Sequence, residues 1–474
     1  MRERHAVVLG GSMAGLLAAR VLTEHFGRVT IVERDETSGE WAGDPEANPR
    51  ERQVRRGVPQ GRHAHGLLAA GLNVVEGLFP GATAELVAAG TPSGDVLGNV
   101  RFGVNGHRLR QAPTGMTALS FSRPYFENYL RAKVFARPGV EVRGGTDVVG
   151  IDADASRARV TGALVQRRDG GGDGGVSGGV GGGVGGGGVG GGVETIAADL
   201  VVDATGRGSR APRWLAGLGY ERPREERLHV DLAYVSRHYK VDPALLGGDV
   251  AMIIGPSAAA PRGGAVMLQE AGRAVITLFG ILGDHAPLDD QGWRAYARRL
   301  PLPDVADVID ASVPLDEPVK FRYPGSVRHR YDRLRRFPKG FVVVGDAMCS
   351  FNPMYGQGMS VAAVEALRLG EALARDGAAG LDALRFFRAV RPVVDIPWQI
   401  ATGGDAALPG VDGPRDARTR LVNRYLHRLY AAAEHDEVVS LAFSRVTNLL
   451  DPPAALLRPA IAARVLGRRR LATA

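Results

Sequence analysis

One stretch near the start of the chain constrains the fold more than any other: "VVLGGSMAGLLAARVL", which begins at Val7. The run "HAVVL" is short, apolar and rich in β-branched residues, which predicts a buried parallel strand. The following "AGLLAARVLTEH" carries its apolar residues at helical spacing. The turn between them comprises Gly10, Gly11, Ser12, Met13, Ala14 and Gly15. A strand, a glycine-rich turn and a helix in this order predict the start of an α/β fold.

The glycine spacing of this turn is typical of a dinucleotide-binding site. The first glycine makes the tight turn, the second lets the backbone approach a pyrophosphate, and the third allows close packing of helix on strand. Gly10 and Gly15 occupy the outer positions, and Ser12 stands at the middle one. A second strand, "RVTIVERD", ends at Glu33, where the acid that binds a ribose hydroxyl is expected. We therefore predict a nucleotide site, with a purely structural turn as the alternative.

Length and composition narrow the class of protein. The 474 residues suffice for two or three domains. The chain has no stretch of 18 apolar residues and no signal-peptide pattern, so we expect a cytoplasmic protein. The single cysteine, Cys349, excludes an internal disulfide framework and a CxxC redox pair. A net charge of +8 suits an anionic partner such as a nucleotide phosphate, and the scattered arginines predict no nucleic-acid partner.

One segment, Asp169 to Glu194, is of low complexity and consists mostly of glycine. Glycine at this density cannot bury apolar surface, so we expect a disordered loop. The sequences on both sides, "ARVTGALVQRR" and "ETIAADLVVDATG", are typical of strands. The segment is therefore predicted to be an expanded hairpin loop, with a docking tail as the alternative.

The pattern along the rest of the chain predicts a two-domain α/β (α+β) architecture with a C-terminal helical region. After Gly219, β-rich runs separated by Gly/Pro turns indicate a mixed, largely antiparallel sheet. "GFVVVGDAM" at Phe341 returns to a buried parallel strand, and helical periodicity dominates from about Arg391. We expect a discontinuous Rossmann-like nucleotide-binding domain (1–90, 120–225, 320–390), a substrate-binding sheet domain (91–119, 226–319) and a helical cap (391–474).

Two later motifs fit the same edge of the predicted parallel sheet. "ADLVVDATGRGSR" places Asp203 and Gly206 at the carboxyl end of a strand, where α/β folds bind ligands. In "FVVVGDAMCSFNPMYGQGMSVAAVEAL", Gly345 and Asp346 end a strand, and a loop through Pro353 leads to a helix. The start of that helix favours negative charge, such as that of the pyrimidine end of a reduced flavin. An ordinary loop before a helix is the alternative.

These three motifs, in this order, resemble the FAD-dependent monooxygenases of the para-hydroxybenzoate hydroxylase type, over roughly Met1 to Arg391. The resemblance implies FAD as cofactor, NAD(P)H as transient reductant and O2 as co-substrate. It assigns the following residues to the FAD site: Gly10, Gly11, Ser12, Met13, Ala14, Gly15, Glu33, Arg34, Arg123, Asp203, Gly206, Gly345, Asp346, Pro353, Gly356, Gln357, Gly358 and Met359.

The same resemblance gives these residues roles. Glu33 would hold the adenosine ribose, Ser12 to Gly15 the pyrophosphate, and Asp346 the ribityl and pyrophosphate region. Residues 356–359 would line the isoalloxazine ring. Arg123, in "FSRPYFENYLRAKV", would reach the FAD phosphates, with a solvated helix arginine as the alternative. The chain departs from the family pattern at Ser12 and in the two residues between Asp203 and Gly206.

Within that family, "RRGVPQGRHAHGLLAAGLNVVEGLFPG" is most similar to the bacterial flavin epoxidases of polyether polyketide biosynthesis, relatives of squalene epoxidase. The resemblance implies epoxidation of an alkene in a hydrophobic polyketide or terpenoid precursor, through a C4a-hydroperoxide of the flavin. Gln60, Gly61 and His63 would lie on the loop that covers the flavin. His63 and His65 have no third ligand nearby, so we expect no metal; covalent attachment of flavin to His63 stays an alternative.

Other functions remain open at this point. An aromatic hydroxylase would share every cofactor motif and differ by a group that activates a phenol, which the sequence does not locate. A flavin halogenase or reductase is disfavoured, because Trp398 stands alone where halogenases have a tryptophan-rich motif. "LLRPAIAARVLGRRR" suggests a flavin-binding module docked on a membrane, although a packed terminal helix explains it too. Oligomeric state stays open. Apolar candidates for a substrate pocket, for which core packing is the competing explanation, are Met252, Met267, Leu278 and Phe279.

Overall fold

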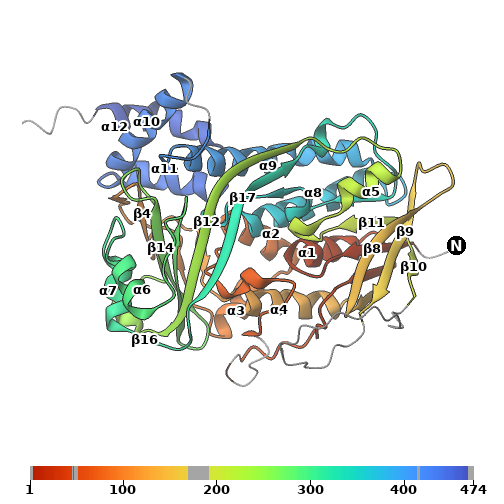
Figure 1. Ribbon diagram of the computed structural model, residues 1–474, viewed down its shortest axis with the longest axis horizontal. Helices are drawn as coiled ribbons and strands as arrows, with labels where there is room; N and C mark the ends of the chain where they lie inside the picture. The colour runs from red at the N-terminus through yellow and green to blue at the C-terminus, as the bar shows by residue number, and fades with distance from the viewer. Residues whose placement is uncertain (1–3, 45, 47–51, 169–191, 414–416, 468–474) are drawn as a thin grey trace, which may run out of the picture.

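The computed structural model of the protein describes residues 4–44, 46, 52–168, 192–413 and 417–467. They form a parallel sheet with its helices, a large and mostly antiparallel sheet, and a group of C-terminal helices (Figure 1). The mixed α/β class predicted from the sequence is confirmed. The predicted loop at 169–194 lies mostly outside the described residues, which resume at 192.

The first unit is a five-stranded parallel sheet with the order β18-β11-β1-β2-β7. Its strands are almost wholly buried at the centre and rich in valine, as expected for a parallel sheet covered on both faces. The bounds are β1 His5–Leu9, β2 Arg28–Val32, β7 Val140–Arg143, β11 Leu200–Asp203 and β18 Phe341–Val343.

Helices and a smaller sheet cover this parallel sheet. Helix α1 (Met13–Leu22) contacts both the sheet and α8 (Gly358–Asp376). The other helices of this unit are α2 Ala69–Leu78, α3 Ala82–Ala88, α4 Arg123–Phe135 and α5 Ala211–Gly217. A three-stranded antiparallel sheet is formed by β8 Thr146–Ala153, β9 Val160–Arg167 and β10 Glu194–Ala197. Because β9 and β10 pair directly, the two strands predicted on either side of the glycine-rich segment are confirmed.

The second unit is a nine-stranded sheet with the order β19-β17-β12-β15-β14-β13-β4-β5, and β16 also pairs with β12. Figure 1 shows its two longest strands, β12 and β17, crossing the molecule side by side. The bounds are β4 Val100–Val104, β5 His107–Arg108, β12 Glu225–Lys240, β13 Ala251–Ile254, β14 Arg262–Gln269, β15 Arg273–Gly280, β16 Val313–Pro314, β17 Val319–His329 and β19 Cys349–Ser350. A separate pair is formed by β3 Ser93–Asp95 and β6 Thr117–Leu119.

One expected domain boundary needs correction. We assigned residues 320–390 to the nucleotide-binding domain, but β17 pairs along most of its length with β12 of the large sheet. Its alternating sequence, "VKFRYPGSVRH", indicates a strand and carries no information on the sheet that it joins. The chain therefore returns to the parallel sheet only at β18.

The two faces of the large sheet have different neighbours. The outer face packs on α6 (Asp290–Ala297) and α7 (Asp304–Ala311) through an apolar cluster that includes Trp293 and Val235. The other face carries Val230, Leu232 and Tyr234 of β12, which belong to a different cluster. We call this second surface the inner face.

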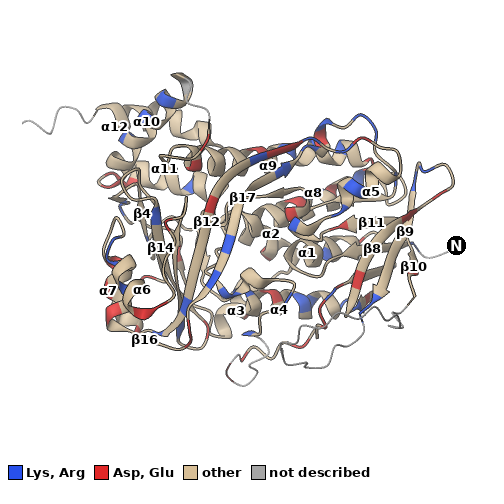
Figure 2. Ribbon diagram, viewed as in Figure 1, with Lys and Arg blue, Asp and Glu red and all other residues tan. Residues whose placement is uncertain are grey.

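The C-terminal helices are α9 Ala383–Ala406, α10 Ala417–Ala433, α11 Glu437–Thr447 and α12 Pro459–Gly467. Helix α9 begins after Asp382, whose carboxylate caps it by accepting a hydrogen bond from the Arg385 amide (3.1 Å), so the expected boundary at 391 falls inside a helix. None of the helices within the described ranges is long and apolar enough to cross a membrane. Figure 2 shows basic and acidic residues interspersed along most elements.

Candidate functional site

The three sequence motifs meet at one edge of the parallel sheet. Strand register places Leu9 beside both Val32 and Asp203, and Asp203 beside Val343. The carboxyl ends of four strands are therefore level, and the turns that follow them emerge together. Segments that lie up to 335 residues apart in the sequence are thus brought to one place.

The first turn requires its glycines. Gly10 has a φ of +97°, and a Cβ atom on it would lie 2.7 Å from the Ala204 carbonyl oxygen. A Cβ on Gly15 would lie 1.8 Å from the Gly10 oxygen, so only glycine lets α1 pack this closely on the strand. Ser12 precedes α1, and its side chain makes no capping bond to the helix. As at any helix start, the first N–H groups have no acceptor within the helix and are suited to an anion.

Glu33 ties the second strand to this turn. Its carboxylate accepts hydrogen bonds from the amides of Gly11 (2.7 Å) and Asp35 (3.0 Å), and it lies 3.1 Å from an Arg55 guanidinium nitrogen. The Glu33 residue is 5% exposed. The neighbouring Arg34 is exposed. Binding of a ribose by Glu33 stays a prediction.

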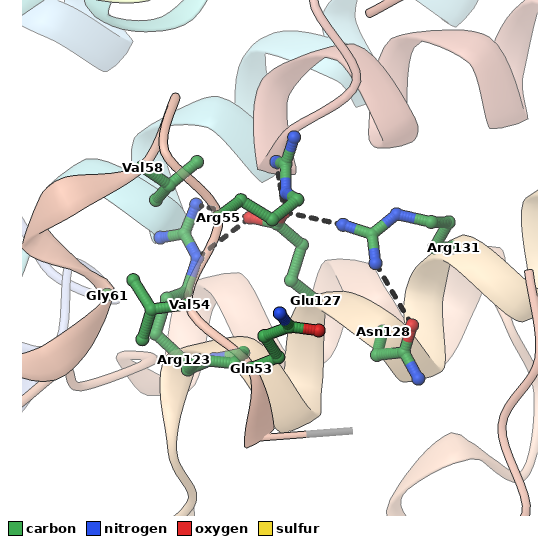
Figure 3. A pocket seen from close by; sticks show the side chains of 10 residues that line it. Gln53, Val54, Arg55, Val58, Gly61, Arg123, Glu127, Asn128 and Arg131 are labelled. Carbon is green, nitrogen blue, oxygen red and sulfur yellow. Dashed lines mark hydrogen bonds and ion pairs between the residues drawn. The ribbon is translucent and has the colours of Figure 1, made fainter. Parts of the chain in front are cut away.

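Three arginines surround one buried carboxylate beside the turn (Figure 3). Glu127 accepts hydrogen bonds from Arg123 (3.1 Å), Arg131 (2.7 Å) and Arg55 (Nε, 3.0 Å), and from the Ser12 hydroxyl (2.7 Å). Burial alone would raise its pKa, but the guanidinium charges of Arg55, Arg123 and Arg131 lower the pKa of Glu127 to about 2. We call Arg55, Arg123, Arg131 and Glu127 the arginine cluster.

The arginine cluster lines a cleft between residues 53–61 and α4. Three guanidinium groups face the carboxylates of Glu127, Glu33 and Asp35, so the formal charges balance. The N–H groups of these arginines beside the start of α1 are donors that suit a pyrophosphate. Arg123 also donates to the Ser12 hydroxyl (2.9 Å), which places it next to the turn, while its contact with the FAD phosphates stays a prediction. Arg55 and Arg131 are functional candidates that the sequence reasoning missed. Arg123, Glu127 and Arg131 are spaced by four residues, a signal that could have revealed one helical face.

The second motif forms a turn stabilised by its own carboxylate. Asp203 is fully buried, and its oxygens accept hydrogen bonds from the Thr205 amide (2.9 Å), the Thr205 hydroxyl (2.5 Å) and the Ser209 hydroxyl (2.6 Å). Burial raises the pKa of Asp203. Gly206 has a φ of +71° and faces Asp346. The geometry thus gives Asp203 a structural task within the turn, while contact with a cofactor stays a prediction.

The third motif depends on a glutamate that the sequence reasoning missed. The Gly345 amide donates to Glu365 Oε2 (2.5 Å), and Glu365 lies on α8 with no exposed surface. Burial, together with the nearby Asp346, raises the pKa of Glu365 to about 8. A Cβ on Gly345 would lie 2.6 Å from the Ala14 Cβ, so the loop packs directly on α1.

Asp346 lies at the start of α8. A Cβ on Gly358, the first residue of α8, would be 3.8 Å from Asp346 Oδ1. Burial raises the pKa of Asp346, against the opposing effects of Arg207 and Arg123. Gln357 precedes the helix, is 1% exposed, and its amide oxygen has no hydrogen-bond partner within the described part of the chain. Of the remaining residues predicted here, Gly356 has a φ of +65°, Pro353 is exposed and Met359 is buried.

The loop that contains Gln60 and His63 is attached to the large sheet. His63 Nδ1 is 2.7 Å from the Ser236 hydroxyl of β12, and Gln60 accepts a backbone hydrogen bond from His63. Burial, with His238 and Arg62, lowers the pKa of His63 to about 4, and burial lowers that of His65 to about 3, so both imidazoles are neutral at pH 7. Across the described residues, no group of three or more His, Cys, Asp or Glu could hold a metal ion.

The inner face of the large sheet lies against the third motif. Its apolar cluster comprises Val230, Leu232, Tyr234, Phe279, Ile281, Tyr323, Leu408 and Val411, with Met354 packed against it. Among the predicted pocket residues, Phe279 belongs to this cluster, and Met267 shares a small cluster with Ala64 of the covering loop. Met252 and Leu278 point to the outer face and form core there.

These features fit an FAD molecule. Gly10, Gly15 and Gly345 leave no room for a Cβ, two helices begin at the same edge, and the arginine cluster offers guanidinium donors. The Gln357 amide oxygen and His63 Nε2 are buried, have no hydrogen-bond partner among the described residues, and lie on the two loops expected to contact the flavin. Gly10, Gly15, Arg123 and Asp346 would hold the pyrophosphate end, and residues 356–359 the ring.

Comparisons with known proteins support this interpretation. The model of the FAD binding domain family matches residues 3–384. Protein Rv3254 of Mycobacterium tuberculosis (strain ATCC 25618 / H37Rv) is 34% identical over 463 residues, 94% of this chain and 90% of that protein. The structure of pqsL, a probable FAD-dependent monooxygenase from Pseudomonas aeruginosa, is similar with a TM-score of 0.61 and 18% identity, over 86% of this chain and 97% of that one.

The flavin-dependent brominase Bmp2 has a similar structure as well, with a TM-score of 0.63 and 17% identity over 94% of both chains. At these identities, likeness to solved structures shows the shared fold. The family match extends over most of the chain and includes all three motifs. The protein therefore belongs to the FAD binding domain family, and FAD is its cofactor.

Proposed function

We propose that the protein uses NAD(P)H and O2 to insert one oxygen atom into a hydrophobic organic substrate, and that this reaction is the epoxidation of an alkene in a polyketide or terpenoid precursor. The observation that carries the proposal is the inner face, where the partly buried Leu228, Phe321 and Met354, the last from the third motif, pack against one apolar cluster. An apolar surface beside the flavin loop suits an apolar substrate. The resemblance of the covering loop to flavin epoxidases supports an alkene.

The chemistry that bound FAD supplies is reduction by NAD(P)H followed by reaction with O2, which provides one oxygen atom for transfer. The chain's own residues bind, orient and exclude water. The arginine cluster and Asp346 fix the cofactor at one end, and the inner face holds the substrate at the other. His63 and His65 are uncharged at neutral pH, which lowers the polarity of the loop that carries them.

A second candidate, aromatic hydroxylation, is favoured by one specific observation. Asp405 lies near the inner face, and burial raises its pKa to about 7, against hydrogen bonds from Asn352 and Tyr355 that lower it. A carboxyl group of this kind can hold or take up the proton of a phenol at neutral pH. The sequence alone did not identify this group.

Two other functions receive less support. Trp398 packs against the main hydrophobic core, so it is not placed as a halogenase residue, and likeness to the brominase Bmp2 concerns the fold. Ile461 and Val465 of α12 are buried in a cluster with α10 and α11, which leaves less apolar surface for docking on a membrane. We propose a hydrophobic small molecule as the partner and no nucleic acid, because acidic and basic residues are interspersed over the elements (Figure 2).

The test begins with the visible spectrum of the purified protein, then anaerobic reduction by NADPH, and then O2 in the presence of olefinic and phenolic compounds. We expect flavin absorbance that bleaches, returns with oxygen and accompanies an epoxide. A hydroxylated phenol without any epoxide would contradict epoxidation and support aromatic hydroxylation, the second candidate. Reoxidation that yields only hydrogen peroxide with every compound would contradict both.

A further inference from the structure

Asp405, near the end of α9, contacts the loop of the third motif. Its Oδ1 accepts two hydrogen bonds, from Asn352 Nδ2 (2.9 Å) and from the Tyr355 hydroxyl (3.0 Å). The approach is close because residue 404 is glycine: a Cβ there would lie 2.2 Å from the Tyr355 hydroxyl oxygen. One oxygen of the carboxylate is thus fixed by two donors from the flavin loop.

The other oxygen of Asp405 is buried and lacks a partner. Asp405 has no exposed surface, and no described residue donates a hydrogen bond to its Oδ2. The hydroxyl of Tyr234, on β12, is buried and partnerless in the same way. Buried polar atoms without partners are costly, and in native proteins they point to a missing ligand or water.

These two atoms belong to the same region. Burial, then the neighbouring Tyr323 and Asp405, raises the pKa of Tyr234 well above its usual value, so Asp405 is within electrostatic reach of the tyrosine. Tyr234 lies in the inner-face cluster, and so does Leu408, which follows Asp405 by three residues. A donor without an acceptor and an acceptor without a donor therefore adjoin the apolar surface.

We propose that Asp405 Oδ2 and the Tyr234 hydroxyl together bind a hydroxyl group of the organic substrate. That group donates a hydrogen bond to Asp405 Oδ2 and accepts one from the Tyr234 hydroxyl. A hydroxyl satisfies both atoms, whereas an ether or a ketone can only accept. The inference rests on the proposed function and deepens it, because it gives the hydrophobic substrate one alcohol or phenol group that fixes its orientation.

Hydrogen bonding at Oδ1 makes this proposal unusually easy to test. In Asp405→Asn, the side-chain carbonyl must occupy the Oδ1 position, because Asn352 and Tyr355 both donate there. The amide nitrogen then takes the place of Oδ2 and becomes a donor. The substitution therefore inverts hydrogen bonding at one atom while it keeps the shape of the side chain.

The experiment measures binding of 4-fluorophenol and 4-fluoroanisole to the FAD-loaded protein by 19F NMR titration at pH 8.5, where Asp405 is a carboxylate and its Oδ2 can only accept. These probes differ by one methyl group, which removes the donor. We expect the wild-type protein to bind the phenol about tenfold more tightly than the ether. In Asp405→Asn the ratio should fall below about twofold. In Tyr234→Phe both probes should weaken together, because both can accept from the tyrosine.

Asp382→Asn is the matched control: the same change on the same helix, at an exposed N-cap where Asn is as good as Asp. It should keep the wild-type ratio, and FAD content verifies that each variant folds. Equal affinities for the two probes in the wild type, no binding of either up to its solubility, or loss of the ratio in Asp382→Asn would each overturn the proposal. A protein that shows the expected ratio yet forms no oxygenated product would refute the proposed function and leave the hydroxyl site standing.

Discussion

The cofactor edge and the inner face are built in opposite ways. At the cofactor edge, backbone geometry decides the structure: Gly10, Gly15 and Gly345 stand where a Cβ would collide with a neighbouring atom. At the inner face, side chains decide it, because residues of three strands, one loop and the end of α9 form a single cluster. A constraint on backbone appears in sequence as glycine at fixed spacing, whereas a surface of side chains carries no such signature.

This difference between the two regions explains why the sequence identifies the cofactor more readily than the substrate. The cofactor follows from short local motifs, and the family match confirms it. The substrate depends on contacts between residues that are far apart in the chain, so relatives with the same cofactor edge can act on different molecules. Substitutions at the glycines of the cofactor edge should therefore abolish binding of FAD, and changes at the inner face should alter selectivity.

The largest effect is expected for Gly15→Ala. A methyl group 1.8 Å from the Gly10 oxygen would force α1 away from the sheet, with a loss of more than about 4 kcal/mol in the free energy of unfolding. Absorbance of bound FAD and thermal unfolding measure the effect. The control is Gly77→Ala in α2, where nothing lies within 4 Å of the new atom. Normal FAD binding by Gly15→Ala would show that the cofactor edge is less dependent on backbone than we argue.

Glu127→Gln tests the arginine cluster, whose side chains stabilise the cofactor edge. The change leaves Arg55, Arg123 and Arg131 around a neutral amide, and should lower the free energy of unfolding of the FAD-free protein by about 4 kcal/mol. The loss should be smaller with FAD bound, because its pyrophosphate supplies negative charge to the same guanidinium groups. Urea unfolding with and without FAD measures both losses. Equal losses would place the pyrophosphate away from the arginine cluster.

The lowered pKa of Glu127 makes the free energy of unfolding depend on pH. Because this pKa is lowered to about 2, the folded state gains stability from the carboxylate above the unfolded pKa near 4.5 and loses it as pH falls from 4.5 towards 2. Glu127→Gln should lack that acid-sensitive component. Unfolding curves between pH 5 and pH 3 should therefore converge for the two proteins.

Glu365→Gln should raise the free energy of unfolding, whereas Glu127→Gln should lower it. The pKa of Glu365 is raised to about 8, so the contribution of Glu365 to stability is largest below the unfolded pKa near 4.5 and is lost as pH rises towards 8. The amide cannot ionise, and the variant should be more stable than the wild type at pH 8 by roughly 2–3 kcal/mol, allowing for its unpaired amide nitrogen. Thermal unfolding at pH 5 and pH 8 measures the difference. A gap that does not grow with pH would contradict the assignment of Glu365 as a buried neutral acid.

The smallest effect is expected for Ser12→Gly, which restores the usual middle glycine. The variant loses the hydrogen bonds of the Ser12 hydroxyl with Glu127 and Arg123, worth about 1 kcal/mol, and keeps the backbone of the turn. Quenching of FAD fluorescence on binding should give a dissociation constant within about fivefold of the wild-type value. A loss of FAD binding would mean that the hydroxyl itself contacts the phosphate.

Particular residues show what the sequence could and could not predict. The strand, turn and helix around Gly10 are encoded within about 25 residues, and the pairing of β9 with β10 follows from their neighbouring patterns. Glu127 meets Ser12 across 115 residues, and Asp405 meets Asn352 across 53, so neither contact leaves a local pattern. Glu365 looks like any polar position in the amphipathic sequence of α8, although it is fully buried. The sheet to which β17 belongs was misassigned for a similar reason, since alternation defines a strand and not its neighbours.

The pairing of β19 with β17 has a consequence for cooperativity. The third motif starts at β18 in the parallel sheet, and only six residues after the end of β18 the chain adds a strand to the large sheet, where Ser350 lies beside Val327. The segment that carries Gly345 and Asp346 is thereby anchored in both sheets, so neither sheet can lose its order without straining the other. We therefore expect both units to unfold in one calorimetric transition, at a temperature that saturating FAD raises for the whole chain at once.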